Sequence, residues 1–379
     1  MASSSLHESY QATPCPSWPV PLSHPHNLYV VGRLHGLAPA VVTGARVLEL
    51  GCGAGGNLLP MAATLPGGQF VGIDLSERQI YMAQTAAQAA NLGNVEFLAG
   101  DALSLAPTLA GSGAGQLFDY IILHGLYSWV PLEVQTALLP LCRQLLALNG
   151  IVYISYNTYP GWHARDLVRA LMLRAGSSAA SPAGRAAAAR AALDELIPAY
   201  AQSDDGYAKL LGEENTRVAK MADSFLLHDL LEVENHPVYI DEFTARAGDA
   251  GLQFISEANV AASREENFSP EARRQLAAID DPMAREQHID FILNRSFRQS
   301  ALCAAGPMVQ RRIAPDWLRD LYLASPVRPL GQDPNGARGE AFFATPDGGR
   351  ISMTVPSAIA ALNHLALTWP NFLTFEALA

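Results

Sequence analysis

The chain has 379 residues, of which 49% are hydrophobic and 16% are charged, and its formal net charge is −11. This length predicts more than one folded unit. Lys209 and Lys220 are the only lysines, so the sequence offers no basic stripe for a phosphate backbone, which argues against nucleic acid as a partner. An acidic surface suits a basic or neutral substrate, although the same surplus of acid also serves solubility.

The cysteines are scattered without a C-x-x-C spacing, so neither a zinc site nor a disulfide framework is predicted. No positively charged segment followed by an apolar one opens the chain, and no stretch of about 18 uninterrupted apolar residues occurs. These patterns predict a cytoplasmic protein with no metal and no membrane partner. They carry no signal for the oligomeric state.

Residues 1–27 are rich in Pro, Ser and His and predict an N-terminal arm, for which the composition favours a loose tail. Over residues 28–160, short apolar runs alternate with longer helical ones, as in a parallel sheet with helices on both faces. Strands are expected at 46–50, 70–74, 95–99, 118–123 and 151–156. Helices are expected at 54–64, 76–91 and 132–148, with a loop or short helix at 102–110.

Residues 161–235 predict a purely helical insertion with an alanine-rich stretch. The α/β rhythm returns over residues 236–305, which predict the last part of the same domain. Gly251 is expected to end its first helix. The elements expected in this part are a helix at 240–250, a strand at 252–258, helices across 270–292 and a strand near 297–303.

Residues 306–379 predict a small α+β unit at the C-terminal end of the chain. Prolines and Gly331 punctuate an expected linker, which is followed by two short strands around a turn and then by an apolar helix. The strands are expected at 340–345 and 350–354, and the helix at 357–368. The chain is expected to end inside this unit, which would leave the unit incomplete.

The first expected strand ends in a turn that is typical of nucleotide-type cofactor sites. Residues 47–57 read Val-Leu-Glu-Leu-Gly-Cys-Gly-Ala-Gly-Gly-Asn. Glycines allow positive φ and close approach of a ligand, and the helix start that follows offers free backbone N–H groups. Because Gly51, Gly53 and Gly56 also satisfy G-x-G-x-x-G, a dinucleotide-dependent dehydrogenase is an alternative.

Side chains at the ends of successive strands separate these alternatives. Asp74 is placed to accept from both ribose hydroxyls, as at NAD and S-adenosylmethionine sites alike. Glu49 favours a ligand with an ammonium group over one with a pyrophosphate. Asp101 can accept from an adenine amino group, and residues 124–129 place aromatic and polar groups where a reactive methyl would lie. Since these strand ends meet at one crevice, we expect S-adenosylmethionine as the cofactor.

Further motifs give the chain its family resemblance. They are Ser23-His24-Pro25, the glycine-containing run at 48–62, Gly72-Ile73-Asp74-Leu75-Ser76, Tyr-Asn-Thr-Tyr-Pro-Gly-Trp at 156–162, His228-Asp229-Leu230-Leu231-Glu232, Asn235-His236-Pro237 and Phe291-Ile292-Leu293-Asn294-Arg295. The chain resembles the class I S-adenosylmethionine-dependent methyltransferases with a C-terminal methyltransferase regulatory domain. This family includes the rickettsial protein-lysine methyltransferases that modify outer-membrane proteins. The motif at 156–162 is the specific one, whereas the glycine loop is shared by the superfamily.

The resemblance implies an α/β fold with a Rossmann-like class I methyltransferase sheet, a helical insertion and a small α+β C-terminal unit. It also implies that the cofactor is held by Glu49, Gly51, Gly53, Asp74, Leu75, Asp101 and Ala102. We extend the predicted cofactor site to Cys52, Asn57, Gln79, His124 and Gly125. The segment 156–162 would border the pocket for the methyl acceptor. Residues 306–379 are expected to form the regulatory-like unit.

Methyl transfer from a sulfonium is an in-line displacement, so the enzyme chiefly positions a neutral nucleophile and excludes water. Burial and the sulfonium charge disfavour the ammonium form of an amine, so a Tyr hydroxyl or an Asn carbonyl would suffice to take its proton. The candidate catalytic residues are Tyr156, Asn157, Tyr159 and His124. The candidate substrate-binding residues are Tyr127, Trp129, Tyr159, Trp162 and His228.

Several of these residues also have ordinary structural interpretations. Trp162 fits a core anchor of the insertion as well as it fits a substrate wall, and Tyr159–Gly161 fit a simple turn. His228 fits an ordinary partner of a helix dipole. The predicted function is N-methylation of an amine, with a protein lysine as the acceptor that the resemblance implies. A small-molecule N-, O- or C-methyltransferase and a catalytically silent cofactor-binding regulator are the alternatives.

Overall fold

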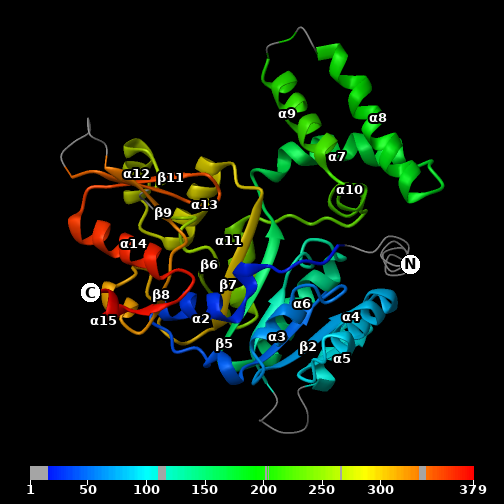
Figure 1. Ribbon diagram of the computed structural model, residues 1–379. Coiled ribbons are helices and arrows are strands. Elements are labelled where there is room, and N and C mark those ends of the chain that lie inside the picture. The colour runs from blue at the N-terminus through cyan, green and yellow to red at the C-terminus, as the bar shows by residue number, and fades with distance from the viewer. Residues whose placement is uncertain (1–15, 110–116, 201–202, 204, 265–266, 333–338) are drawn as a thin grey trace. The chain divides into compact units, whose positions relative to one another are not determined.

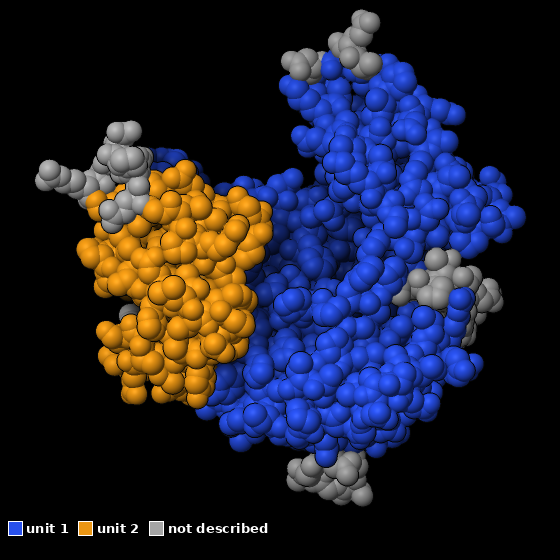
Figure 2. All heavy atoms as spheres, in the orientation of Figure 1, with its two compact units in different colours: residues 1–32, 37–311 blue, residues 33–36, 312–379 orange. Residues whose placement is uncertain are grey.

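The computed structural model describes residues 16–109, 117–200, 203, 205–264, 267–332 and 339–379. The chain forms two compact units (Figure 2). Unit 1 contains residues 1–32 and 37–311, and unit 2 contains residues 33–36 and 312–379. Among the helices of the described residues, none combines the length and hydropathy needed to cross a membrane.

Unit 1 is built on a seven-stranded sheet (Figure 1). Its strands are β1 Arg46–Leu50, β2 Gln69–Asp74, β3 Val95–Ala99, β4 Phe118–Leu123, β5 Leu146–Asn157, β6 Leu252–Glu257 and β7 Phe297–Ala304. They lie in the order β3-β2-β1-β4-β5-β7-β6, and all expected strands of this part of the chain are confirmed. Strands β1 to β5 pair in parallel, whereas β7 runs antiparallel to both β5 and β6. This reversed strand distinguishes the sheet from that of dinucleotide-binding folds, whose strands run mostly parallel.

Helices cover both faces of this sheet. One face carries α2 Pro25–Leu34, α3 Leu58–Thr64 and α4 Glu77–Ala89. The other carries α5 Ala102–Leu109, α6 Leu132–Leu145 and α11 Ile240–Asp249. These helices pack on the sheet through apolar stripes. In helix α11, the stripe consists of Ile240, Phe243 and Ala247, which are fully buried. Gly251 follows α11 with a φ of +75°, as expected of a glycine that ends a helix.

The expected insertion is helical, as predicted. It comprises α7 Trp162–Gly176, α8 Pro182–Tyr200, α9 Gly206–Lys220 and α10 Asp223–Asp229. These helices share a hydrophobic cluster of their own, which includes Val168, Leu193 and Leu226. The alanines of α8 that belong to the cluster, Ala186 and Ala189, are small enough to let neighbouring helices approach closely. Two further helices, α12 Pro270–Ala277 and α13 Pro282–Leu293, precede β7.

Unit 2 has a small antiparallel sheet in the order β11-β10-β9, with β9 Arg328–Gln332, β10 Ala341–Ala344 and β11 Arg350–Met353. The remaining elements are β8 Tyr322–Leu323, α14 Pro356–Thr368, β12 Leu373–Thr374 and α15 Phe375–Leu378. The expected hairpin and the helix after it are confirmed. The expected linker at Pro329 and Gly331 is wrong, because this segment is the edge strand β9, where proline is tolerated.

Candidate active site

The turn after β1 has the backbone geometry that its glycines predict. Gly51, Gly53 and Gly55 have φ values of +75°, +54° and +76°. A Cβ on Gly53 would lie 3.1 Å from Oε1 of Gln79, and one on Gly55 would lie 2.7 Å from Cζ of Phe97. Left-handed backbone and close packing together require glycine here, and they hold the loop in one shape at the carboxyl end of the sheet.

Asp74 ends β2 and faces this glycine loop. Its Oδ2 accepts a hydrogen bond from the backbone N–H of Gly53 at 2.8 Å, and its Oδ1 accepts one from Ser76 at 2.8 Å. Burial raises the pKa of Asp74, and the two backbone hydrogen bonds oppose that rise. A carboxylate has about four acceptor positions, so Asp74 can still accept from the hydroxyls of a ribose.

Glu49 lies inside β1 and is only 3% exposed. Its Oε1 accepts from Nδ2 of Asn57 at 2.8 Å, whereas Oε2 has no hydrogen-bond partner among the described residues. Burial raises the pKa of Glu49 to about 8, and the hydrogen bond from Asn57 acts in the opposite direction. A buried carboxylate oxygen without a donor is costly unless a ligand supplies one. The α-ammonium group of S-adenosylmethionine is a donor of the required charge.

The arm before α2 packs on the same loop. Oγ of Ser17 accepts from the N–H of Gly56 at 2.8 Å, and Oδ1 of Asn57 accepts from the N–H of Val20 at 2.8 Å. The expected loose tail is therefore wrong for this part of the arm, because its partners lie about 40 residues further along the chain. Residues 1–15 lie outside the described residues.

A pocket opens at the carboxyl ends of the first four strands. Six of the predicted cofactor-binding residues line it: Gly51, Asp74, Leu75, Asp101, Ala102 and Gly125. The rest of the lining is almost wholly apolar and comes from Ile73, Gly100, Leu126, Trp129, Val130, Pro131, Val134 and Leu138. Small-molecule sites typically combine apolar walls with a few orienting polar groups, and this pocket suits the adenosine part of the cofactor. The carboxylate of Asp101 also accepts from Oγ of Ser104 at 2.8 Å.

The other predicted cofactor-binding residues do not line this pocket. Glu49, Cys52, Gly53 and Asn57 belong to β1 and the glycine loop, and Gln79 belongs to α4. Cys52 is 3% exposed and Gln79 is 1% exposed. Oε1 of Gln79 is a buried acceptor without a partner among the described residues.

His124 follows β4 and lies next to Gly125 of the pocket lining. Its Nδ1 is 3.1 Å from Oη of Tyr153, and its ring meets the edge of Phe297 at a centroid distance of 6.3 Å. Burial lowers the pKa of His124 to about 4, so its imidazole is neutral at physiological pH. Phe297 is 40% exposed beside it. Sequence reasoning missed Tyr153 and Phe297; the alternation of side chains along β5 was the signal that could have found Tyr153.

Two predicted site residues are instead part of the core. Tyr156 is 1% exposed and Tyr127 is fully buried. Both pack on Phe243 of α11, with ring centroids 4.2 Å and 5.5 Å away. The alternation along β5 turns Tyr156 toward α11 and Tyr153 toward His124. Both side chains therefore pack in the core beside the sheet, and the catalytic role of Tyr156 and the substrate role of Tyr127 stay predictions.

Comparison with known proteins identifies the family. Residues 42–207 match the model of a methyltransferase domain, and residues 222–304 match that of a predicted methyltransferase regulatory domain. The protein RP789 of Rickettsia prowazekii is 35% identical over 376 residues, which span 98% of this chain and 67% of that protein. RP028 of the same organism is 35% identical over 239 residues, or 63% of this chain and 93% of that protein.

A solved structure extends the likeness to the fold. PKMT2 from Rickettsia typhi in complex with AdoHcy matches this chain with a TM-score of 0.83 and 33% identity, over 96% of this chain and 70% of that one. The chain belongs to the class I S-adenosylmethionine-dependent methyltransferases with a methyltransferase regulatory domain. S-adenosylmethionine is its cofactor.

The regulatory-domain match of this methyltransferase lies at 222–304. It therefore covers α10, α11 and strands β6 and β7 of the main sheet, and not the C-terminal residues 306–379 for which the regulatory name was expected. The segment that matches the regulatory domain is therefore part of unit 1, because its strands β7 and β6 complete the main sheet.

The segment after β5 of the methyltransferase is only partly open. Asn157 is 3% exposed, and its Nδ2 donates to Oδ1 of Asn235 at 2.8 Å. Tyr159 is half-buried; its Oη donates to Oδ2 of Asp166 at 3.3 Å, and its ring stacks on His163 at 4.0 Å. Burial, followed by the negative charge of Asp166, raises the pKa of Tyr159 to about 12. The Tyr159 hydroxyl therefore stays protonated and points its proton at Asp166.

The remaining predicted substrate residues divide between the pocket and the insertion. Trp129 lines the pocket. Trp162 is 2% exposed and meets Trp129 edge to face at 6.0 Å, with the guanidinium of Arg165 5.1 Å from its ring centroid. Its indole Nε1 is buried without a hydrogen-bond partner among the described residues. His228 is 4% exposed within α10. Among the described residues, no group of three or more His, Cys, Asp or Glu side chains could hold a metal ion.

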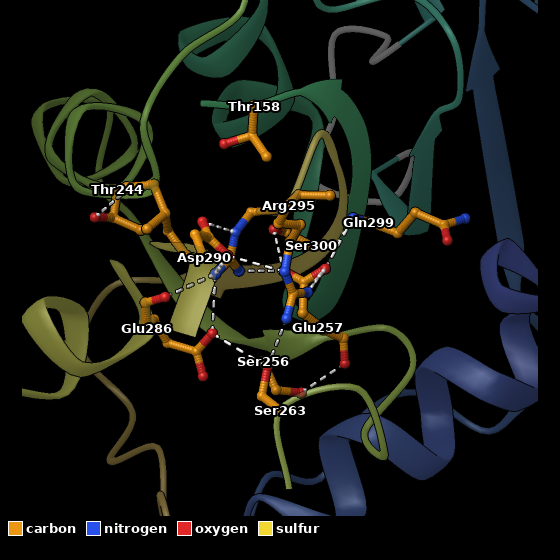
Figure 3. Close-up of polar contacts among 12 residues, drawn as sticks. Thr158, Thr244, Ser256, Glu257, Ser263, Glu286, Asp290, Arg295, Gln299 and Ser300 are labelled. Atoms are coloured by element: carbon orange, nitrogen blue, oxygen red, sulfur yellow. Dashed lines mark hydrogen bonds and ion pairs between the residues drawn. The ribbon is translucent and has the colours of Figure 1, made fainter. Parts of the chain in front are cut away.

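A buried ionic network stands beside the site and ties β6, β7 and α13 together (Figure 3). Arg298 of β7 is fully buried; it binds Oε1 of Glu257 at 2.7 Å and both oxygens of Asp290 at 2.8 Å. Arg295 adds an ion pair to Asp290 at 2.9 Å. Burial would raise the pKa of Glu257, but Arg298 and Arg295 outweigh it and lower that pKa. The network therefore joins strands β6 and β7 to helix α13 through buried charges.

Proposed function

We propose that this methyltransferase transfers the methyl group of S-adenosylmethionine to the side-chain amine of a protein lysine. The cofactor supplies an electrophilic methyl group on its sulfonium. The observation that carries the proposal is the likeness to PKMT2, which spans 96% of this chain and therefore includes the insertion and the regulatory segment as well as the cofactor half. The resemblance of the motif at 156–162 to the rickettsial protein-lysine methyltransferases supports the same acceptor.

Both signs of charge lie around this motif: the guanidinium of Arg165 is 5.1 Å from the ring centroid of Trp162, whereas acidic groups act on Tyr159 and suit a cationic acceptor. Asp166 and Glu242 both act on Tyr159, and the chain as a whole carries a net charge of −11. Such a potential raises the local concentration of a lysine ammonium group and speeds its encounter. Near the sulfonium, burial and positive charge then lower the pKa of the ammonium group, so the neutral amine forms without a strong base. The chain chiefly has to align that amine with the methyl group and exclude water.

The proposal is tested by mass spectrometry after incubation with S-adenosylmethionine and a lysine-rich, unstructured protein. We expect mass additions of one or more methyl groups at lysine residues, and no addition to the same protein after its lysines have been acetylated. Free lysine and small primary amines, offered at the same amine concentration, should react far more slowly. Methylation confined to small molecules would contradict the proposal, as would tight AdoHcy binding without turnover on any acceptor.

A further inference from the structure

A line of hydrogen bonds leads from β7 through β5 to the end of β4. Nε2 of Gln299 donates to Oη of Tyr153 at 2.6 Å, and Oη of Tyr153 lies 3.1 Å from Nδ1 of His124. The antiparallel register pairs Tyr153 with Ala301 and Ser155 with Gln299, so these side chains emerge on the same face of the sheet. The backbone N–H of Gln299 is fixed in turn by Oε2 of Glu257 at 2.9 Å.

The donor and acceptor in each of these hydrogen bonds follow from the protons that each side chain carries. The amide nitrogen of Gln299 can only donate, so the Tyr153 oxygen accepts there. The single phenolic proton of Tyr153 is then free to point at Nδ1 of His124. A neutral imidazole that accepts at Nδ1 carries its proton on Nε2. The contact with Tyr153 engages Nδ1 of His124 and leaves Nε2 for a further partner.

We propose that Tyr153 and Gln299 are positioning residues that hold His124 in its Nε2–H tautomer, so that the ring offers the acceptor side a hydrogen-bond donor and not a base. His124 adjoins the pocket through Gly125 and faces Phe297. Its Nδ1 lone pair is occupied by Tyr153 and is unavailable for proton abstraction. The donor at Nε2 suits a carbonyl or carboxylate oxygen of the bound cofactor or acceptor. The link to the acceptor rests on the proposed function, whereas the tautomer does not.

The neutral state of the ring agrees with this arrangement. Burial alone lowers the pKa of His124, and no charge contributes. The ring contacts Tyr153 and Phe297, and the carboxylates of Glu257 and Glu49 act on Tyr153. Their effect, together with burial, raises the pKa of Tyr153, which keeps its proton available for His124.

The tautomer is measured by ¹H–¹⁵N correlation spectra of the full-length protein with labelled histidine, without any acceptor. The chain has ten histidines, so His124→Asn identifies the signal. We expect the Nε2–H pattern in the wild type. Gln299→Glu is close in shape but accepts from Tyr153, which must then accept from His124, so the ring should switch to Nδ1–H. Gln299→Met removes the hydrogen bond to Tyr153 without supplying an acceptor, so the ring of His124 should show a mixture of the two tautomers. Tyr153→Phe should also give a mixture.

Kinetics supply the second readout. In the Nδ1–H tautomer, the ring of His124 stays in place but cannot donate from Nε2. Gln299→Glu should therefore lower kcat by about tenfold or more and change the KM for S-adenosylmethionine by less than about twofold. Gln299→Met should lie between that variant and the wild type. A wild-type Nδ1–H signal, or a Gln299→Glu variant with unchanged tautomer or unchanged kcat, would overturn the proposal. If lysine proves not to be the acceptor, the spectra still decide the tautomer, so the two failures are distinguishable.

Discussion

The two carboxylate oxygens of Glu49 differ in their hydrogen bonding. One of its oxygens is held by Asn57, and the other is buried without a donor among the described residues. We propose that the ammonium group of the cofactor donates to this second oxygen. On this proposal, Glu49 favours an amino-acid-bearing cofactor over a dinucleotide.

We expect Glu49→Gln to weaken AdoHcy binding by about 2 kcal/mol, or roughly thirtyfold in Kd, because a charged hydrogen bond is replaced by a neutral one. Isothermal titration calorimetry measures the change. Glu77→Gln, which alters a carboxylate in the first turn of α4, is a suitable control and should bind normally. An unchanged affinity for Glu49→Gln would place the ammonium group elsewhere.

The same carboxylate makes the stability of the cofactor-free protein depend on pH. The pKa of Glu49 is raised from 4.5 to about 8 in the folded chain, so this group costs progressively more stability as the pH rises from about 4.5 to about 8. Glu49→Gln should therefore gain stability over the wild type at pH 9 and little at pH 5, as measured by urea unfolding. Saturating AdoHcy should abolish the wild-type loss, since an ammonium partner favours the ionised form.

At the scale of elements, we expect the loss of a buried arginine of the ionic network to lower the unfolding free energy far more than the loss of an exposed arginine. Arg298→Met leaves the carboxylates of Glu257 and Asp290 buried without their main partner, which typically costs 3–5 kcal/mol, or about half of a domain's stability. Arg274→Met breaks an exposed ion pair with Glu271 and should cost about 0.5 kcal/mol or less. Urea unfolding of both variants tests the difference. Equal losses would show that the network contributes no more than a surface pair.

The arm predicts a second element-scale effect. Asn57→Ala removes the partner of the Val20 N–H and of Oε1 of Glu49. Leaving such buried groups unpaired costs about 1–3 kcal/mol, so the unfolding free energy should fall by that amount. Hydrogen exchange should also become faster in residues 17–23, because they lose their hold on the glycine loop. Unchanged exchange there would mean that the arm is held by other contacts.

Local signals account for what could be predicted from the sequence at this scale. The strands of unit 1 and the glycine loop were predictable because apolar runs, breaks and glycines mark them within a few residues. Tyr153 and Gln299 were not, because they are 146 residues apart and meet only through the antiparallel pairing of β7 with β5. The packing of Tyr156 on Phe243 was not predictable either, because a motif does not say which face of a strand each of its residues occupies.

At the scale of the whole molecule, the division into two units predicts separable responses to the cofactor. Every residue placed in the cofactor site belongs to unit 1, and unit 2 has its own small core around Val327 and Phe343. AdoHcy at about 100 times its Kd should raise the midpoint of the unit 1 transition by about 4 °C and leave the unit 2 transition in place. Differential scanning calorimetry measures both. A single transition that shifts as a whole would show that the units unfold together.

The reversed strand β7 also has a consequence for how this enzyme family diversifies. The residues proposed to bind the cofactor lie between residues 49 and 138, whereas Phe297, which contacts His124, and Gln299, which contacts Tyr153, lie inside the regulatory match. Changes in that later stretch would therefore alter the surroundings of His124 and leave the residues proposed for the cofactor unchanged. Exchange of residues 222–304 between relatives would be a natural route to new methyl acceptors.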